Sequence, residues 1–129
     1  MKIRHLWLAP TALILATATL SAWAVPPAPQ GFQLGGDATR GKAVYARSCA
    51  LCHGPAGKGD GAMAAGLDPK PQDFTSRAEM GKRSDWEIYL VIRDGGKAVG
   101  RSPQMLSYKS MLADPQIRDV AAYVRSLAK

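Results

Sequence analysis

The segment Cys49-Ala50-Leu51-Cys52-His53 holds both cysteines of the chain and a histidine. Two thiols three positions apart can reach the two vinyl groups on one edge of a porphyrin. The histidine that follows directly can then place its imidazole on the iron. This C-x-x-C-H spacing is typical of covalent attachment of a c-type haem. It predicts Cys49 and Cys52 as the attachment points and His53 as the proximal metal ligand.

Other chemistry for these residues is less well supported. A thiol–disulfide redox pair would use the same cysteines, but no βαβ pattern surrounds them. A structural zinc site needs about four ligands, and residues 25–129 supply only two Cys and one His. A structural disulfide suits an exported protein but gives His53 no role. Haem attachment is favoured, and a haem-free thiol oxidoreductase remains an alternative.

His53 is the only histidine after residue 24, so a second histidine ligand within residues 25–129 is excluded. The sixth position of the iron is then filled by a methionine or another weak ligand, or it stays open. Met63 follows His53 by only ten residues and would have to cross to the opposite face of the haem. Spacing leaves Met105 and Met111 open as candidates.

Capping signals predict three helices that would position these groups. Asp37 precedes a helix over 38–50, and Ser84 with Glu87 forms a capping-box pattern at the start of a helix that ends at Arg93. Asp114 is predicted as the cap of a third helix, with Pro115 at the first helical position and apolar residues at helical spacing after it. The stretches 54–83 and 94–113 are rich in Gly, Pro, Lys and Asp. Long irregular stretches are uncommon in compact domains unless they are functional.

The 129 residues support one domain, and a 21% charged fraction beside 47% apolar residues argues against a disordered chain. Much of the apolar content after residue 24 is alanine, so the core is lean for a domain of this size. Either the fold is marginal, or something outside the amino-acid chain supplies part of the core and the two irregular stretches wrap it. No nucleic-acid motif accompanies the net charge of +7.

Residues 1–24 have the features of an export signal: basic residues, an apolar run to Leu20, and small residues at 22 and 24. We expect cleavage after Ala24 and a periplasmic location, and the alternative is an uncleaved membrane anchor. Removing Lys2 and Arg4 from the 17 basic residues, against 10 acidic ones, leaves a net charge of +5. Residues 25–36 are rich in Pro and Gly and are predicted as a tether.

From residue 37 to residue 129 the sequence resembles the class I c-type cytochromes of the short bacterial kind. The matching segments are GDATRGKAVYARSCALCHGPAGKGDG, SDWEIYLVIRDGG, SPQMLSY and DPQIRDVAAYVRSL. The resemblance implies an all-α cytochrome c fold, with three main helices and long loops around one covalently bound haem. It also implies a protein that carries single electrons between redox partners and transforms no small-molecule substrate.

The resemblance extends to individual residues. It favours Met105 over Met111 as distal ligand, because related cytochromes place the ligand in an S-P-x-M segment about twelve residues before the Ile of the last helix. It implies that a proline carbonyl accepts the second N–H of His53, with Pro71 favoured over Pro69. It also implies that Gly41 meets Tyr123 where the first and last helices cross. The haem-pocket wall is expected to contain Phe74, Trp86, Tyr89, Ile92 and Tyr108.

Seven basic residues lie in or beside the two irregular stretches: Lys58, Lys70, Lys82, Arg83, Lys97, Arg101 and Lys109. If these stretches frame the haem edge, a basic rim would steer acidic redox partners. Two further hypotheses stay open. In one, the chain is the haem subunit of a larger oxidoreductase complex; in the other, it is an enzyme or gas sensor with an open iron site.

Overall fold

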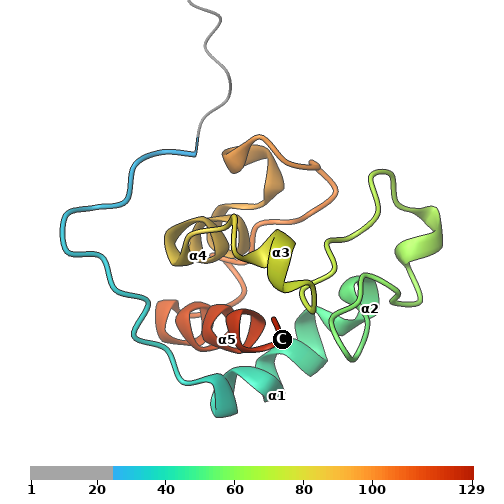
Figure 1. The fold of residues 1–129 in the computed structure, drawn as a ribbon, viewed down its shortest axis with the longest axis horizontal. Coiled ribbons are helices and arrows are strands. Elements are labelled where there is room, and N and C mark those ends of the chain that lie inside the picture. Colours follow the sequence, from blue (N-terminus) through green and yellow to red (C-terminus); the bar gives the residue numbers. More distant parts are fainter. Residues whose placement is uncertain (1–24) are drawn as a thin grey trace, which may run out of the picture.

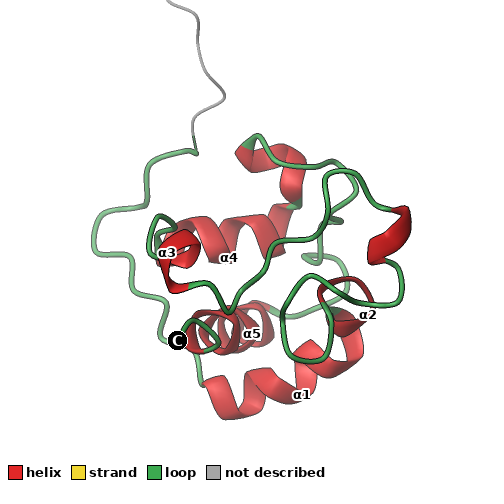
Figure 2. Cartoon of the chain, turned by 45° about the vertical axis from the view of Figure 1, so that its right-hand side comes forward, coloured by secondary structure: helices red, strands yellow, loops and turns green. Residues whose placement is uncertain are grey.

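The structure, a computed structural model, describes residues 25–129, and the predicted export signal lies outside them. Every regular element of the described residues is helical, which confirms the all-α fold class (Figures 1 and 2). The elements in chain order are α1 (Ala38–Ser48), α2 (Ala50–His53), η1 (Ala64–Gly66), α3 (Arg77–Met80), α4 (Asp85–Asp94), η2 (Gly96–Val99) and α5 (Asp114–Ser126).

Local capping explains where the long helices begin. The Asp37 carboxylate accepts the N–H groups of Thr39 and Arg40 at 2.7 and 3.1 Å, which starts α1 as predicted. Ser84 Oγ likewise accepts the N–H of Glu87 at the start of α4. The last helix differs from the prediction, because Asp114 is its first residue and Ala113 holds the cap position.

The crossing of α1 and α5 is confirmed at Gly41. This glycine is buried, and a Cβ placed on it would lie 2.0 Å from the carbonyl oxygen of Asp119 and 2.9 Å from Cβ of Tyr123. Only a residue without a side chain lets the two helices approach this closely. The contact aligns α1 against α5, and α1 leads directly into the C-x-x-C-H segment.

A buried carboxylate holds the same crossing together. Asp119 is 6% exposed and accepts the backbone N–H of Asp37 at 2.7 Å. Its other contacts are Arg40 Nε at 2.8 Å and Arg40 Nη2 at 2.9 Å. The hydrogen bond from Arg40, together with that from the Asp37 N–H, lowers the pKa of Asp119.

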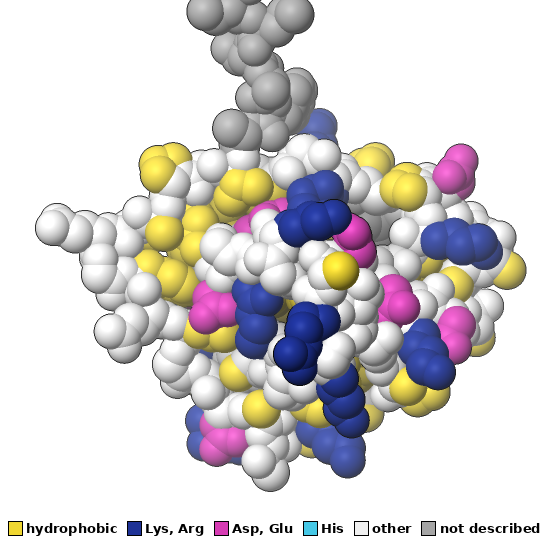
Figure 3. All heavy atoms as spheres, viewed as in Figure 1, with side chains coloured by type: hydrophobic (Ala, Val, Ile, Leu, Met, Phe, Trp, Pro, Cys, Tyr) yellow, Lys and Arg dark blue, Asp and Glu magenta, His cyan; other side chains and the backbone are white. Residues whose placement is uncertain are grey.

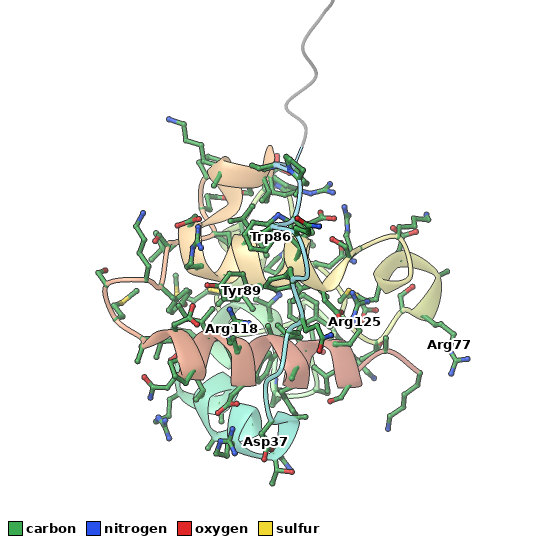
Figure 4. The ribbon with its side chains drawn as sticks, turned by 90° about the vertical axis from the view of Figure 1, so that its left-hand side faces the viewer. Asp37, Arg77, Trp86, Tyr89, Arg118 and Arg125 are labelled. Carbon is green, nitrogen blue, oxygen red and sulfur yellow. The ribbon has the colours of Figure 1, made fainter. Side chains whose placement is uncertain are left out.

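Residues 25–36 were predicted as a flexible tether, but they pack along α4 and α5 (Figure 4). The ring of Phe32 lies 4.9 Å from that of Trp86, and Leu34 is buried. Arg118 Nη1 on α5 donates to the carbonyl of Leu34 at 3.0 Å. The prediction failed because Pro and Gly content indicates backbone character, whereas the few apolar side chains in the segment find a partner only in the folded domain.

Among the described residues no helix is both long and apolar enough to cross a bilayer. The core cluster draws on α1, α3, α4 and α5: Val44, Tyr45, Met80, Ile88, Tyr89, Ile92, Ile117, Val120, Ala121 and Val124. Residues from the long loops between these helices, such as Pro71 and Met105, contribute to the wall of the site described next.

Candidate functional site

A cavity of about 400 Å³ lies between the helices and the long loops. Its wall includes Cys49, Cys52 and His53 from the C-x-x-C-H segment, and Met105 from the loop before α5. The rest of the lining is mainly apolar. A volume of this size with an apolar wall and a few polar groups suits a cofactor or small ligand.

One short helix presents the C-x-x-C-H residues. The chain turns at Cys49, whose carbonyl accepts the N–H of Cys52 at 3.2 Å and of His53 at 2.9 Å. This single turn brings both thiols and the imidazole to the cavity. No disulfide joins the two cysteines, and burial raises the pKa of the Cys49 thiol to about 12.

The backbone and an aromatic ring orient His53. Its Nδ1 lies 3.2 Å from the carbonyl oxygen of Gln72, and its ring stacks on Phe74 with centroids 4.4 Å apart. Burial lowers the pKa of His53 and so favours the neutral ring. With Nδ1–H donating to Gln72, the neutral ring keeps a lone pair on Nε2, which is the form that binds a metal.

The predicted partner of His53 was therefore wrong by one residue. Pro71 lines the cavity, but the carbonyl that reaches His53 belongs to Gln72. The carbonyl of Pro71 faces Gly59, where a Cβ would lie 2.3 Å from its oxygen. The carbonyls of Pro71 and Gln72 therefore face different neighbours, and only that of Gln72 reaches the imidazole of His53.

The four methionines of residues 25–129 differ sharply in position. Met105 and Met80 line the cavity, whereas Met63 and Met111 are 52% and 59% exposed and are not part of its wall. Met80 is 2% exposed and belongs to the core cluster. The backbone of Met105 is held on both sides, because its carbonyl accepts the N–H of Gly96 at 2.9 Å and its own N–H donates to Ser102 at 3.2 Å.

Tyr108 also lies in the cavity wall and connects it to the attachment segment. Its hydroxyl donates to the carbonyl of Ser48 at 2.6 Å, directly before Cys49. Burial raises the pKa of Tyr108, so the hydroxyl remains a donor at neutral pH. Phe74 and Ile92, which were expected in the wall, line it as well.

Trp86 and Tyr89 were predicted in the pocket wall, and the structure places both elsewhere. Trp86 Nε1 donates to the carbonyl of Pro26 at 2.8 Å, and the Tyr89 hydroxyl pairs with Asp114 (Figure 4). Trp86 and Tyr89 are three positions apart and share one face of α4. The cavity is lined by the other face of this helix, which carries Glu87, Ile88, Val91 and Ile92.

Sequence reasoning expected basic residues around the cavity but missed the acidic residue in its wall, Glu87. Lys70, Arg83, Glu87 and Arg101 line the cavity, and Glu87 bonds both arginines. Glu87 was interpreted only as part of a helix cap. The available signal was its spacing of four residues from Val91 on α4, which places the two side chains on one face of the helix.

The cytochrome c family model matches residues 38–128, so the chain belongs to the cytochrome c family. A solved c-type cytochrome, KustC0563, is similar at 25% identity with a TM-score of 0.58, covering 69% of this chain and 98% of that one. The Kuenenia stuttgartiensis reducing HAO-like protein complex Kustc0457/Kustc0458 contains a chain that is 27% identical with a TM-score of 0.58. That match covers 80% of this chain and 51% of the other, so this chain spans about half of its length.

Membership of this family implies a covalently bound c-type haem and a role in electron transfer with redox partners. The residues present fit that group. Two thiols and the neutral imidazole of His53 face one cavity with a mainly apolar wall. Among residues 25–129 no cluster of three or more His, Cys, Asp or Glu side chains offers a metal site of another kind.

Proposed function

We propose that the protein is an exported cytochrome c with one haem that carries single electrons between redox proteins, with His53 and Met105 as axial ligands. The observation that carries this proposal is the cavity, in which both cysteines, the only described histidine and Met105 meet. The exposure of Met111 and its absence from the wall favour Met105 over the runner-up. The haem supplies an iron that alternates between iron(III) and iron(II).

The chain's own residues prepare the site for this reaction. Cys49 and Cys52 would hold the cofactor, and the Gln72 carbonyl together with the Phe74 ring orients the imidazole of His53. The backbone bonds around Met105 support a soft ligand that raises the potential relative to a second histidine. Apolar groups in the wall exclude water and so limit the reorganisation that accompanies electron transfer.

Basic and apolar groups at the cavity mouth support docking of acidic redox partners. Lys70 and Arg101 are exposed lining residues, and Leu106 beside Met105 is 61% exposed. Figure 3 shows further Lys and Arg side chains on one face with acidic side chains between them. Four of the seven predicted rim residues form ion pairs within the domain: Lys82, Arg83, Arg101 and Lys109. The field that steers a partner is therefore weaker than seven charges would produce.

A second candidate is a haem subunit that passes electrons from a separate catalytic chain within a complex. The similarity to a chain of a reducing HAO-like complex favours it. Both candidates share the same site and differ in whether the protein leaves its partner. Gel filtration and pull-down from native periplasm distinguish them, because a carrier elutes at the size of one chain and a subunit elutes with its partner.

Two measurements test the proposed function. Mass spectrometry of the mature protein should show a start at Val25 and the added mass of one haem. Met105→Ala should abolish the weak Met–iron(III) band at the red end of the visible spectrum, whereas Met111→Ala, the matched control, should keep it. A haem-free mass, or a Met105→Ala protein that keeps the band, would refute the corresponding part of the proposal.

A further inference from the structure

Three of the four charged side chains in the cavity wall form one ion-paired group, the Glu87 cluster, made of Arg83, Glu87 and Arg101. Arg83 Nη1 lies 3.1 Å and Arg101 Nη2 lies 2.9 Å from the same oxygen, Glu87 Oε1. Glu87 and Arg101 are 14 residues apart in the sequence. The cluster therefore joins the start of α4 to the loop that carries Met105.

Glu87 does not make the local contact that its sequence pattern predicts. In a capping box its carboxylate would accept the backbone N–H of Ser84. Only the other half of the box forms, from the Glu87 N–H to Ser84 Oγ at 3.1 Å. The Glu87 side chain is 12% exposed, and its carboxylate forms ion pairs with the two arginines. Residues that depart from a local rule are often found at functional sites.

The chemistry of the cofactor indicates what the cluster faces. Haem carries two carboxylates on the edge opposite its vinyl groups, and Cys49 and Cys52 hold the vinyl edge at α2. Helix α2 packs against α1 and η1, whereas α4 packs against α5 and η2. Figures 1 and 2 both show α2 and α4 well apart. The carboxylate edge therefore points away from α2 and needs cations in the wall that receives it.

The charges in the wall match this need. Lys70, Arg83 and Arg101 with the single carboxylate of Glu87 give the charged lining a net charge of +2, and two haem carboxylates carry −2. Each guanidinium has five N–H donors. Among the described residues each arginine of the cluster uses one of them on a side chain, that of Glu87. The remaining donors can bind a second carboxylate, as arginine forks commonly do.

We propose that the Glu87 cluster binds a haem carboxylate through Arg83 and Arg101, and that Glu87 positions the two guanidinium groups and lowers the redox potential. The proposal rests on haem binding in this cavity. A negative charge beside the haem favours iron(III), which is the more positive state, and positive charges favour iron(II). Removal of Glu87 and removal of either arginine must therefore shift the potential in opposite directions.

The test is the midpoint potential of holoprotein variants. Glu87→Gln should raise it, and Arg83→Gln and Arg101→Gln should each lower it. Each change should alter the iron(III) to iron(II) ratio at a fixed applied potential by at least threefold, about 28 mV at 59 mV per tenfold. Arg101→Lys keeps the charge without the fork and should lie between Arg101→Gln and wild type. Arg77→Gln is the control, because it removes the same charge from an exposed residue outside the cavity wall (Figure 4).

The outcomes separate this proposal from the proposed function. Variants that keep the covalent haem mass but shift no more than Arg77→Gln would overturn the role of the cluster and leave the electron-carrier proposal intact. A shift of Glu87→Gln in the same direction as the arginine variants would also overturn it, since general loosening moves all variants alike. If an Arg→Gln variant does not fold, the midpoint potentials of Glu87→Gln and Arg101→Lys still test the role of the cluster. Wild-type protein without haem mass would refute the proposed function instead.

Discussion

Replacing Gly41 by Ala should destabilise the domain, although Ala is the better helix former. The new Cβ would lie 2.0 Å from the carbonyl oxygen of Asp119 and 2.9 Å from Cβ of Tyr123. The closer of these atoms belongs to the α5 backbone, so no rotamer change relieves the overlap. This contact must lengthen by about 1.4 Å to reach 3.4 Å, where ordinary van der Waals contact begins.

The size of this effect follows from three contributions. Overpacking of a core costs about 1–3 kcal/mol. Separation of the helices also lengthens the 2.7 Å bond from the Asp37 N–H to Asp119, and a hydrogen bond to a charged group contributes about 1.5–3 kcal/mol. Higher helix propensity offsets about 1 kcal/mol. We expect Gly41→Ala to lower the free energy of unfolding by about 2–4 kcal/mol, and Gly41→Leu to lower it further.

Urea denaturation of the holoprotein, followed by far-UV circular dichroism, measures this loss. Gly66→Ala is the matched control, because a Cβ at Gly66 would have no atom within 4 Å. The control should stay within about 0.5 kcal/mol of wild type. A Gly41→Ala protein that also stays within this range would refute the argument that close approach at Gly41 aligns α1 with α5.

Three further predictions concern other parts of the molecule. Phe32→Ala removes a ring 4.9 Å from Trp86. It should lower the free energy of unfolding in urea denaturation by about 2–3 kcal/mol, less than the roughly 3–5 kcal/mol of a core Phe because the ring is only partly buried. An unchanged value would mean that residues 25–36 do not stabilise the domain. The pKa of Asp119 is lowered from 3.8 mainly by the hydrogen bond from Arg40, so its stabilisation is complete above the unfolded pKa and is lost as the pH falls through the folded pKa. Unfolding free energies measured from pH 7 to pH 2 should therefore fall less steeply in Asp119→Asn, and parallel curves would contradict this. The Cys49→Ala, Cys52→Ala apoprotein should show no cooperative thermal transition in circular dichroism, and a sharp transition would contradict a core that depends on haem.

Helix α4 illustrates how far sequence patterns reach. Its ends were predicted closely, because Ser84 and Gly95 act through bonds to their own neighbours. Its faces were not, because apolar and aromatic residues nearly surround the helix and no polar stripe marks the side that faces solvent. Trp86 and Tyr89 were therefore assigned to the pocket wall, and the structure packs them against Phe32.

The same limit applies to the loops around the cavity. Carbonyls from Pro71 and Gln72 alternate in direction, and only the folded loop decides which of them reaches His53. Spacing alone left Met105 and Met111 open, whereas the structure places one in the cavity wall and the other on the surface.

The sequence by itself determined the features that depend on neighbouring residues. The C-x-x-C-H segment lies within one helical turn, so its thiols and imidazole act together wherever that turn is placed. The caps at Asp37 and Ser84 likewise bond to residues two or three positions away. Only the tertiary structure decided the inward face of α4, the carbonyl at His53 and the pairing of Glu87 with Arg101. These depend on segments brought together by packing, which no local pattern encodes.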